Sequence, residues 1–375
     1  MALQEQHILS DHKRSPALDT LFVVDLDVHL NETPTDLIPF CPLPWRKSLE
    51  AIAKVPWRYL DIPGFSPQSA PWAVMPTIER RTTVSSPEQM REDLDLLGVD
   101  IGVLFPDHFL MHAMIKPPAY AIALAEAYNR WLIEVWLAED RGLKGAVLAP
   151  HQDPVVAAAE IRKHAGHPHI ACVYLPTCCV DPLYGNRRYD PLYEAAEECG
   201  LPVVLHSVTA VHPVFPFNVN AFDTVFAAHI VSHGLAMIAN AISMFETGVM
   251  VRFPELKIAF TEGGVAWVPW LAMRLDKEYS ERRRDVPHLT DRPSSYLREM
   301  FFSTQPIEEP ERMRDMATLM ELFDGENCVV FASDWPHHDF DHPDKVLQIP
   351  LSDEARRKVM GLNAARLLKL EVPTR

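Results

Sequence analysis

Glycine is scarce in this sequence, with 14 glycines among 375 residues, and no glycine-rich loop follows the first apolar run. A dinucleotide-binding sheet needs such a loop, because closely spaced glycines let the backbone approach the pyrophosphate. The sequence therefore disfavours a dinucleotide cofactor. An open doubly wound sheet remains only as the alternative to the fold predicted below.

Paired cysteines are absent as well. The six cysteines form no Cys-x-x-Cys pair, so the sequence indicates neither a zinc knuckle nor a disulfide framework. We expect reduced thiols and a cytoplasmic location. The first 16 residues include charged side chains and no apolar core of signal-peptide length, which fits that expectation.

Positive charge and long apolar runs are also lacking. The 35 Lys and Arg residues against 51 Asp and Glu residues give a net charge of −16, which argues against nucleic acid or an anionic membrane as a partner. The longest apolar stretch, near residues 230–251, is interrupted by His233, Asn240 and Glu246. With 48% hydrophobic residues, we predict one domain over residues 1–375 that acts on a small molecule.

Short apolar runs recur along the chain and alternate with segments of helical spacing. Eight such runs, each followed by a helical segment, predict an α/β fold of the closed (β/α)8 TIM-barrel type. The runs cover residues 22–29, 100–105, 143–149, 170–175, 202–206, 256–262, 300–303 and 328–334. The helical segments cover residues 86–97, 118–138, 153–164, 191–199, 236–249, 268–283, 310–323 and 352–370.

A proline-rich stretch separates the first run from the first helical segment. Residues 31–82 carry Trp45, Trp57 and Trp72, and we interpret them as a long insertion over the barrel mouth. Its role is either packing or substrate binding.

Four side chains able to bind a metal stand at the downstream ends of apolar runs: Asp27, His29, His206 and Asp334. Because side chains alternate along a strand, Asp27 and His29 are expected to point to the same side. Zinc, manganese and iron accept mixed carboxylate and imidazole ligands, and a catalytic site leaves one position open. The set predicts a catalytic site with one or two divalent transition metal ions.

Several longer motifs resemble the amidohydrolase-related group that contains aminocarboxymuconate-semialdehyde decarboxylase. This resemblance extends over about residues 22–370 and implies a metal-dependent TIM barrel, with the four side chains above at family ligand positions. It also suggests a homodimer. The motifs include DVHLNE from Asp27, YDPLYEAAE from Tyr189, LPVVLH from Leu201, EGGVAW from Glu262 and SDWPH from Ser333.

The chain departs from the family pattern at two positions, and the first of these departures places decarboxylation in doubt. Family decarboxylases carry a His at the end of strand six, where this chain has Glu262, and a carboxylate cannot replace an imidazolium. The fourth strand ends in Tyr174-Leu175-Pro176, without the Lys of two-metal hydrolases. If two metals are bound, Glu262 is the candidate extra ligand, and otherwise it is a base or a buried structural acid.

The expected function is therefore a metal-dependent hydrolase, in which a metal-activated water attacks an amide, ester, lactone or thioester carbon. Asp334 would move the proton, with His206 and Glu262 as the other catalytic residues. The expected substrate contacts are His229, His233, His337, His338 and Trp267.

Two alternatives remain open at this point: a metal-dependent non-oxidative decarboxylase and a metal-free barrel that only binds a ligand. Arg187, Arg188 and Arg274 offer positive charge to an anionic group, although surface solvation explains them better.

Overall fold

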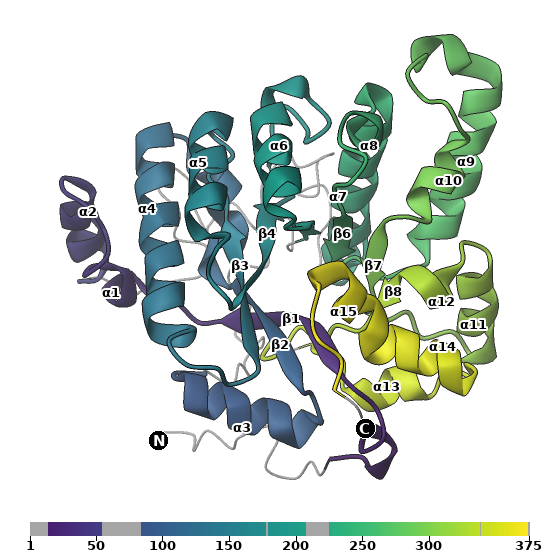
Figure 1. Cartoon of the computed structure of the whole chain (residues 1–375), viewed down its shortest axis with the longest axis horizontal. Helices are drawn as coiled ribbons and strands as arrows, with labels where there is room; N and C mark the ends of the chain where they lie inside the picture. The colour runs from purple at the N-terminus through teal and green to yellow at the C-terminus, as the bar shows by residue number, and fades with distance from the viewer. Residues whose placement is uncertain (1–13, 55–83, 178, 208–224, 338, 374–375) are drawn as a thin grey trace.

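The structure, a computed structural model, describes residues 14–54, 84–177, 179–207, 225–337 and 339–373. Its centre is one sheet of eight strands in the order β1 to β8, and all seven strand ladders between successive strands are parallel. Helices lie around this sheet in Figure 1. The arrangement is that of a (β/α)8 TIM barrel, as predicted from the alternating runs.

The strands are β1 (Val24–Leu30), β2 (Ile101–Pro106), β3 (Leu143–Leu148), β4 (Ile170–Pro176), β5 (Val203–His206), β6 (Ile258–Thr261), β7 (Phe301–Ser303) and β8 (Val329–Val330). The helices from β1 to β6 are α1 (Pro34–Leu37), α2 (Trp45–Ile52), α3 (Pro87–Leu97), α4 (Pro118–Trp131), α5 (Pro154–His164), α6 (Asp190–Cys199), α7 (Val225–Thr247) and α8 (Val249–Arg252). Those after β6 are α9 (Trp267–Arg282), α10 (Pro293–Leu297), α11 (Arg314–Glu321), α12 (Gly325–Cys328), α13 (Pro343–Leu347), α14 (Asp353–Arg357) and α15 (Asn363–Leu368).

The strand predicted over residues 328–334 is shorter than expected, because only Val329–Val330 pairs as a ladder with β7. The chain beyond it still follows β1. The amide of Leu26 donates to the Phe331 carbonyl at 3.0 Å, and the amide of His29 donates to the Trp335 carbonyl at 2.7 Å. These bonds bring the first and last strands together, so that the residues after β8 lie beside the end of β1.

Strand β1 is buried along its whole length, and its two faces have different chemistry. Val24, Leu26 and Val28 alternate with polar residues and belong to the hydrophobic core. The other face carries Asp25, Asp27 and His29, all with no exposed surface. Because burial of charged groups is costly unless they are paired, this polar face requires partners inside the barrel.

Some helix ends follow local sequence signals and others differ from the prediction. Ser86 caps α3, with its side chain accepting from the Gln89 amide, and Gly98 ends this helix in the left-handed conformation at φ 80°. Helix α7 starts earlier than the predicted residue 236, and the predicted helix over 118–138 ends in a π-helical turn at Leu132–Trp136. Among the described residues, no helix is long and apolar enough to span a membrane.

Part of the predicted insertion is described. Residues 34–37 and 45–52 form α1 and α2, and the Trp45 ring lies 5.1 Å from that of Tyr120 on α4. Trp57 and Trp72 fall outside the described residues. The described half of this segment therefore packs on the outer helices of the barrel.

Candidate metal centre

Strand β1 and the segment after β8 bring three of the predicted ligands together. Nε2 of His29 lies 3.1 Å from Asp27 Oδ1 and 3.0 Å from Asp334 Oδ1. The Asp334 amide donates to the Asp27 carbonyl at 2.9 Å, which fixes the backbone of one ligand against that of another. All three side chains are buried.

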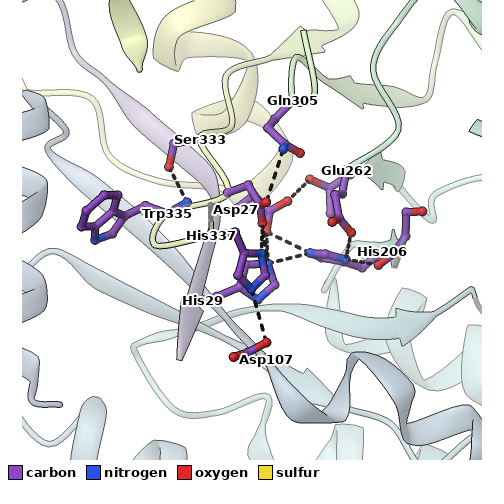
Figure 2. Close-up of polar contacts among 12 residues, drawn as sticks. Asp27, His29, Asp107, His206, Glu262, Gln305, Ser333, Trp335 and His337 are labelled. Carbon is purple, nitrogen blue, oxygen red and sulfur yellow. Dashed lines mark hydrogen bonds and ion pairs between the residues drawn. The ribbon is translucent and has the colours of Figure 1, made fainter. Parts of the chain in front are cut away.

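Strand β5 supplies the fourth predicted ligand at its last residue. Nε2 of His206 lies 2.9 Å from Asp27 Oδ1 and 3.2 Å from Nε2 of His29. The two imidazole rings meet edge to face at 83°. Figure 2 shows Asp27, His29 and His206 pointing toward one another. We call Asp27, His29, His206 and Asp334 the ligand cluster.

Both imidazoles of the ligand cluster carry their free lone pair on Nε2. Nδ1 of His29 donates to the Pro106 carbonyl at 2.8 Å, and Nδ1 of His206 donates to the Ser207 carbonyl at 2.6 Å. A bond of this kind fixes the tautomer, so each neutral ring carries its lone pair on Nε2. Asp27, His29 and His206 have the atoms and the spacing to hold one metal ion.

The electrostatics of the cluster also fit a cation. Burial and the neighbouring His337 lower the pKa of His29, but Asp27 and Asp334 raise it overall to about 10. Against burial, Asp27 and Glu262 raise the pKa of His206 to about 10. The carboxylates thus demand positive charge. Protons on two Nε2 atoms that face each other would repel, whereas one divalent ion supplies the charge between them.

His337 binds Asp334 from outside this cluster. Its Nδ1 lies 2.7 Å from Asp334 Oδ1 and its Nε2 lies 3.3 Å from Asp107 Oδ1. Its ring stacks on that of His29 with a centroid distance of 4.2 Å and an angle of 23°. Lone pairs lie in the planes of their rings, so two nearly parallel stacked rings cannot both coordinate one ion. We therefore assign His337 to Asp334, although His29, Asp334 and His337 also have the spacing to hold a metal ion.

Asp107 is a site residue that the sequence analysis missed. It has no exposed surface and follows β2, and its Oδ2 accepts from the side-chain amide of Asn31 at 3.0 Å. Glu32 in turn accepts from the backbone amides of Asp107 and Phe109. Burial and the Asp107 charge raise the pKa of Glu32 to about 8. The signal was available, since Asp107 ends an apolar run as the predicted ligands do.

Glu262 follows β6 and lies beside His206, outside the described groups able to hold a metal. Its Oε2 is 3.2 Å from Nδ1 of His206, on the side of the ring opposite to Nε2. Burial raises the pKa of Glu262, but His233 and His206 hold it at about 2. Glu262 and Asp334 both have positive φ, at 61° and 66°, a strained conformation that is common at functional sites.

The other predicted substrate contacts are spread over several places. His233 lies 3.5 Å from Glu262, and the half-buried His229 one turn earlier on α7 lies 3.5 Å from Asp339. Trp267 is placed away from the ligand cluster: its ring packs against Phe260 and Phe302 and its Nε1 donates to the Gly264 carbonyl. His338 lies outside the described residues.

Further buried polar groups fix the two carboxylates of the cluster. Thr261 Oγ1 donates to Asp27 Oδ2 at 3.0 Å, and the Gln305 side chain donates to Asp334 Oδ2 at 3.3 Å. Asp25 accepts from the amides of Asp27 and Ser333, and burial raises its pKa to about 7. Hydroxyl and amide side chains at these positions carry no distinctive sequence signal, which is why they were missed.

A parallel barrel with a carboxylate and imidazole cluster at the carboxyl ends of β1, β5 and β8 defines the class of metal-dependent barrel enzymes. Comparison with known proteins makes this specific. A family model described as amidohydrolase matches residues 81–370, and the chain belongs to this family of enzymes, which use divalent metals.

Named relatives include decarboxylases. Gamma-resorcylate decarboxylase of Rhodococcus jostii strain RHA1 is 26% identical over 281 residues, covering 67% of this chain and 78% of that protein. The structure of 5-carboxyvanillate decarboxylase LigW from Sphingomonas paucimobilis superposes with a TM-score of 0.72 at 21% identity, covering 94% of this chain and 100% of that chain. Dihydroxybenzoic acid decarboxylase from Polaromonas sp. JS666 was solved with manganese and the inhibitor 2-nitroresorcinol. It superposes with a TM-score of 0.66 at 18% identity, covering 94% of this chain and 98% of that chain.

The hydrolase function predicted from the sequence is wrong. The relatives are non-oxidative decarboxylases, which agree with the alternative reading of the sequence. The inference from Glu262 to hydrolysis is therefore wrong, whereas the roles predicted for Glu262 itself stay predictions. The fold brings an imidazole, that of His233, to within 3.5 Å of this carboxylate.

Proposed function

We propose that this protein is a metal-dependent, non-oxidative decarboxylase of a small hydroxylated aromatic carboxylic acid, with manganese as the metal. The observation that carries the proposal is the ligand cluster, built from β1, β5 and β8 in a chain whose relatives decarboxylate such acids. A bound divalent ion would act as a Lewis acid that holds the carboxylate and stabilises negative charge on the substrate.

Asp27, His29, His206 and Asp334 would hold this ion. Their ring tautomers and carboxylate orientations are set in advance by the Pro106 and Ser207 carbonyls and by Thr261 and Gln305. Such outer contacts keep the ligands in place without reorganisation during the reaction.

Decarboxylation breaks the bond between the ring carbon and the carboxylate carbon, releases carbon dioxide and leaves the ring carbon to receive a proton. The proton shared by His337 Nδ1 and Asp334 Oδ1, which are 2.7 Å apart, is placed beside the ligand cluster. Burial lowers the pKa of His337, but Asp334 and Asp107 raise it well above its ordinary value. Asp334 is therefore the candidate residue to pass this proton on.

The test is to load the purified protein with manganese and to supply 2,6-dihydroxybenzoate and 5-carboxyvanillate, with carbon dioxide release as the readout. We expect release that depends on the metal and is lost in His206→Ala. Release of neither carbon dioxide nor phenol by fully loaded protein, across a panel of hydroxybenzoates, would overturn the proposed function.

A further inference from the structure

Two buried polar atoms beside the ligand cluster have no hydrogen-bond partner among the described residues: Nε2 of His233 and Oε2 of Glu262. His233 is 4% exposed and Glu262 is 5% exposed, so water does not bathe either group. Buried polar atoms without partners are rare and costly, and they mark places where a water or a ligand belongs.

Oε2 of Glu262 is a hydrogen-bond acceptor, whereas Nε2 of His233 accepts in the neutral ring and donates in the protonated ring. Nδ1 of His233 faces two acceptors of Glu262, the backbone carbonyl at 3.1 Å and Oε1 at 3.5 Å, so Nδ1 carries the proton. Nε2 of the neutral ring then holds a lone pair. Glu262 Oε2 lies 3.2 Å from Nδ1 of His206, but that nitrogen donates to the Ser207 carbonyl at 2.6 Å. A ligand group that fits here must bring a donor.

The pair is also connected to the ligand cluster. Glu262 lies between His206 and His233, and His206 reaches the cluster through its other ring nitrogen. Ser207 Oγ donates to the His233 carbonyl at 3.3 Å, which ties α7 to the residue after β5. One imidazole ring, that of His206, therefore separates the pair from the ligand cluster.

We propose that His233 and Glu262 form a subsite that binds a hydroxyl substituent of the substrate. The inference rests on the proposed function, because it assumes an aromatic acid at the ligand cluster. A hydroxyl group donates to Nε2 or to Oε2 and relieves an unpartnered atom, whereas a ring hydrogen relieves neither. This hydroxyl is distinct from any group bound directly by the metal.

The test uses nitrophenols, in which a nitro group stands for the substrate carboxylate and no decarboxylation occurs. Binding of 2-nitrophenol and of its four derivatives with a second hydroxyl, 2-nitroresorcinol among them, is titrated by absorbance on manganese-loaded protein. We expect at least one derivative to bind roughly tenfold more tightly than 2-nitrophenol, as one hydrogen bond provides. That gain should fall to about onefold in His233→Phe and return in part in His233→Gln.

Two controls and one further test variant accompany this experiment. Manganese content shows that each variant is folded and loaded, and His169→Gln tests the same substitution at the half-buried His169, which pairs with Lys144 before β4. Glu262→Gln should reduce the gain as well, because it removes the carboxylate.

The outcomes separate the two proposals. No gain in the wild type, or a gain that survives both His233→Phe and Glu262→Gln, would overturn the subsite and leave the decarboxylase intact. If no nitrophenol binds the loaded protein, the proposed function falls and the subsite falls with it.

Discussion

Two polar clusters of this molecule, one buried and one reaching the surface at Lys163, differ in whether their polar atoms have hydrogen-bond partners. The ligand cluster lies inside the barrel and brings lone pairs and carboxylate oxygens to face one another. A second group, which we call the Asn129 cluster, consists of Asn129, Glu160, Lys163 and His164, and joins α4 and α5 to the end of β3. Both clusters are rich in charged side chains, but they differ in whether acceptor atoms face donors or face other acceptors.

In the Asn129 cluster, the side-chain oxygens of Asn129 and Glu160 each face a hydrogen-bond donor. Asn129 donates to the Leu148 carbonyl at 3.0 Å and accepts from the Leu148 amide at 2.9 Å. The two oxygens of Glu160 face Lys163 at 2.8 Å and His164 at 3.1 Å. The structural cluster is thus complete in itself, whereas the ligand cluster is complete only with an added cation.

The largest expected effect is that of Asp27→Asn, which replaces the carboxylate shared by His29 and His206 with a neutral amide. We expect manganese affinity and carbon dioxide release to fall by more than about a hundredfold, because loss of a direct ligand exceeds the effect of losing an outer contact. Elemental analysis and an activity assay give the result. A manganese affinity near that of the wild type would contradict the assigned role of the ligand cluster, because the cluster would then not need its central carboxylate.

Asn129→Leu tests the other side of the comparison. It leaves the amide and carbonyl of Leu148 without their side-chain partner, and we expect a loss of about 2 to 3 kcal/mol in the free energy of unfolding. Urea unfolding measures this loss. Activity per folded, metal-loaded protein should stay near that of the wild type, and a selective loss of metal binding would contradict the structural role.

Asp107→Asn tests an outer contact of the ligand cluster. The carboxylate supports His337, which orients Asp334, and removing its charge should weaken manganese affinity by about tenfold. A chelator competition titration measures the affinity. Asp341→Asn is the matched control, because Asp341 is also a buried carboxylate beside a cation, Lys345, and accepts from the Ile307 amide without contacting the cluster. Equal effects in both variants would exclude a specific role for Asp107.

Glu160→Gln should have the smallest effect, a loss of about 1 kcal/mol in unfolding free energy at neutral pH. Burial raises the pKa of Glu160, but His164 and Lys163 hold it at about 2, below its ordinary value of 4.5. A lowered carboxyl pKa contributes stability that is present above pH 4.5 and is lost as the pH falls toward 2. The stability difference between wild type and variant, followed by thermal unfolding, should therefore shrink over that window. A difference independent of pH would refute the charge contribution.

Much of the barrel was predictable from the sequence. The eight apolar runs appear as strands in the predicted order, because burial on both faces of a parallel sheet leaves a clear apolar signal. The last strand was overestimated, since the segment after Val330 contacts β1 through one isolated parallel bridge, Val28 with Trp335, and a few backbone hydrogen bonds. These contacts depend on the position of β1, just over three hundred residues away along the chain.

The sequence by itself determined the strand-end placement of Asp27, His29, His206 and Asp334, because a residue that ends an apolar strand must reach the mouth of a parallel barrel. Only the tertiary structure decided what surrounds them. Asp107 reaches His337 across 230 residues, and His233 returns from α7 to Glu262. These pairs are formed by elements far apart in the chain, and local periodicity carries no information about which side chains such elements bring into contact.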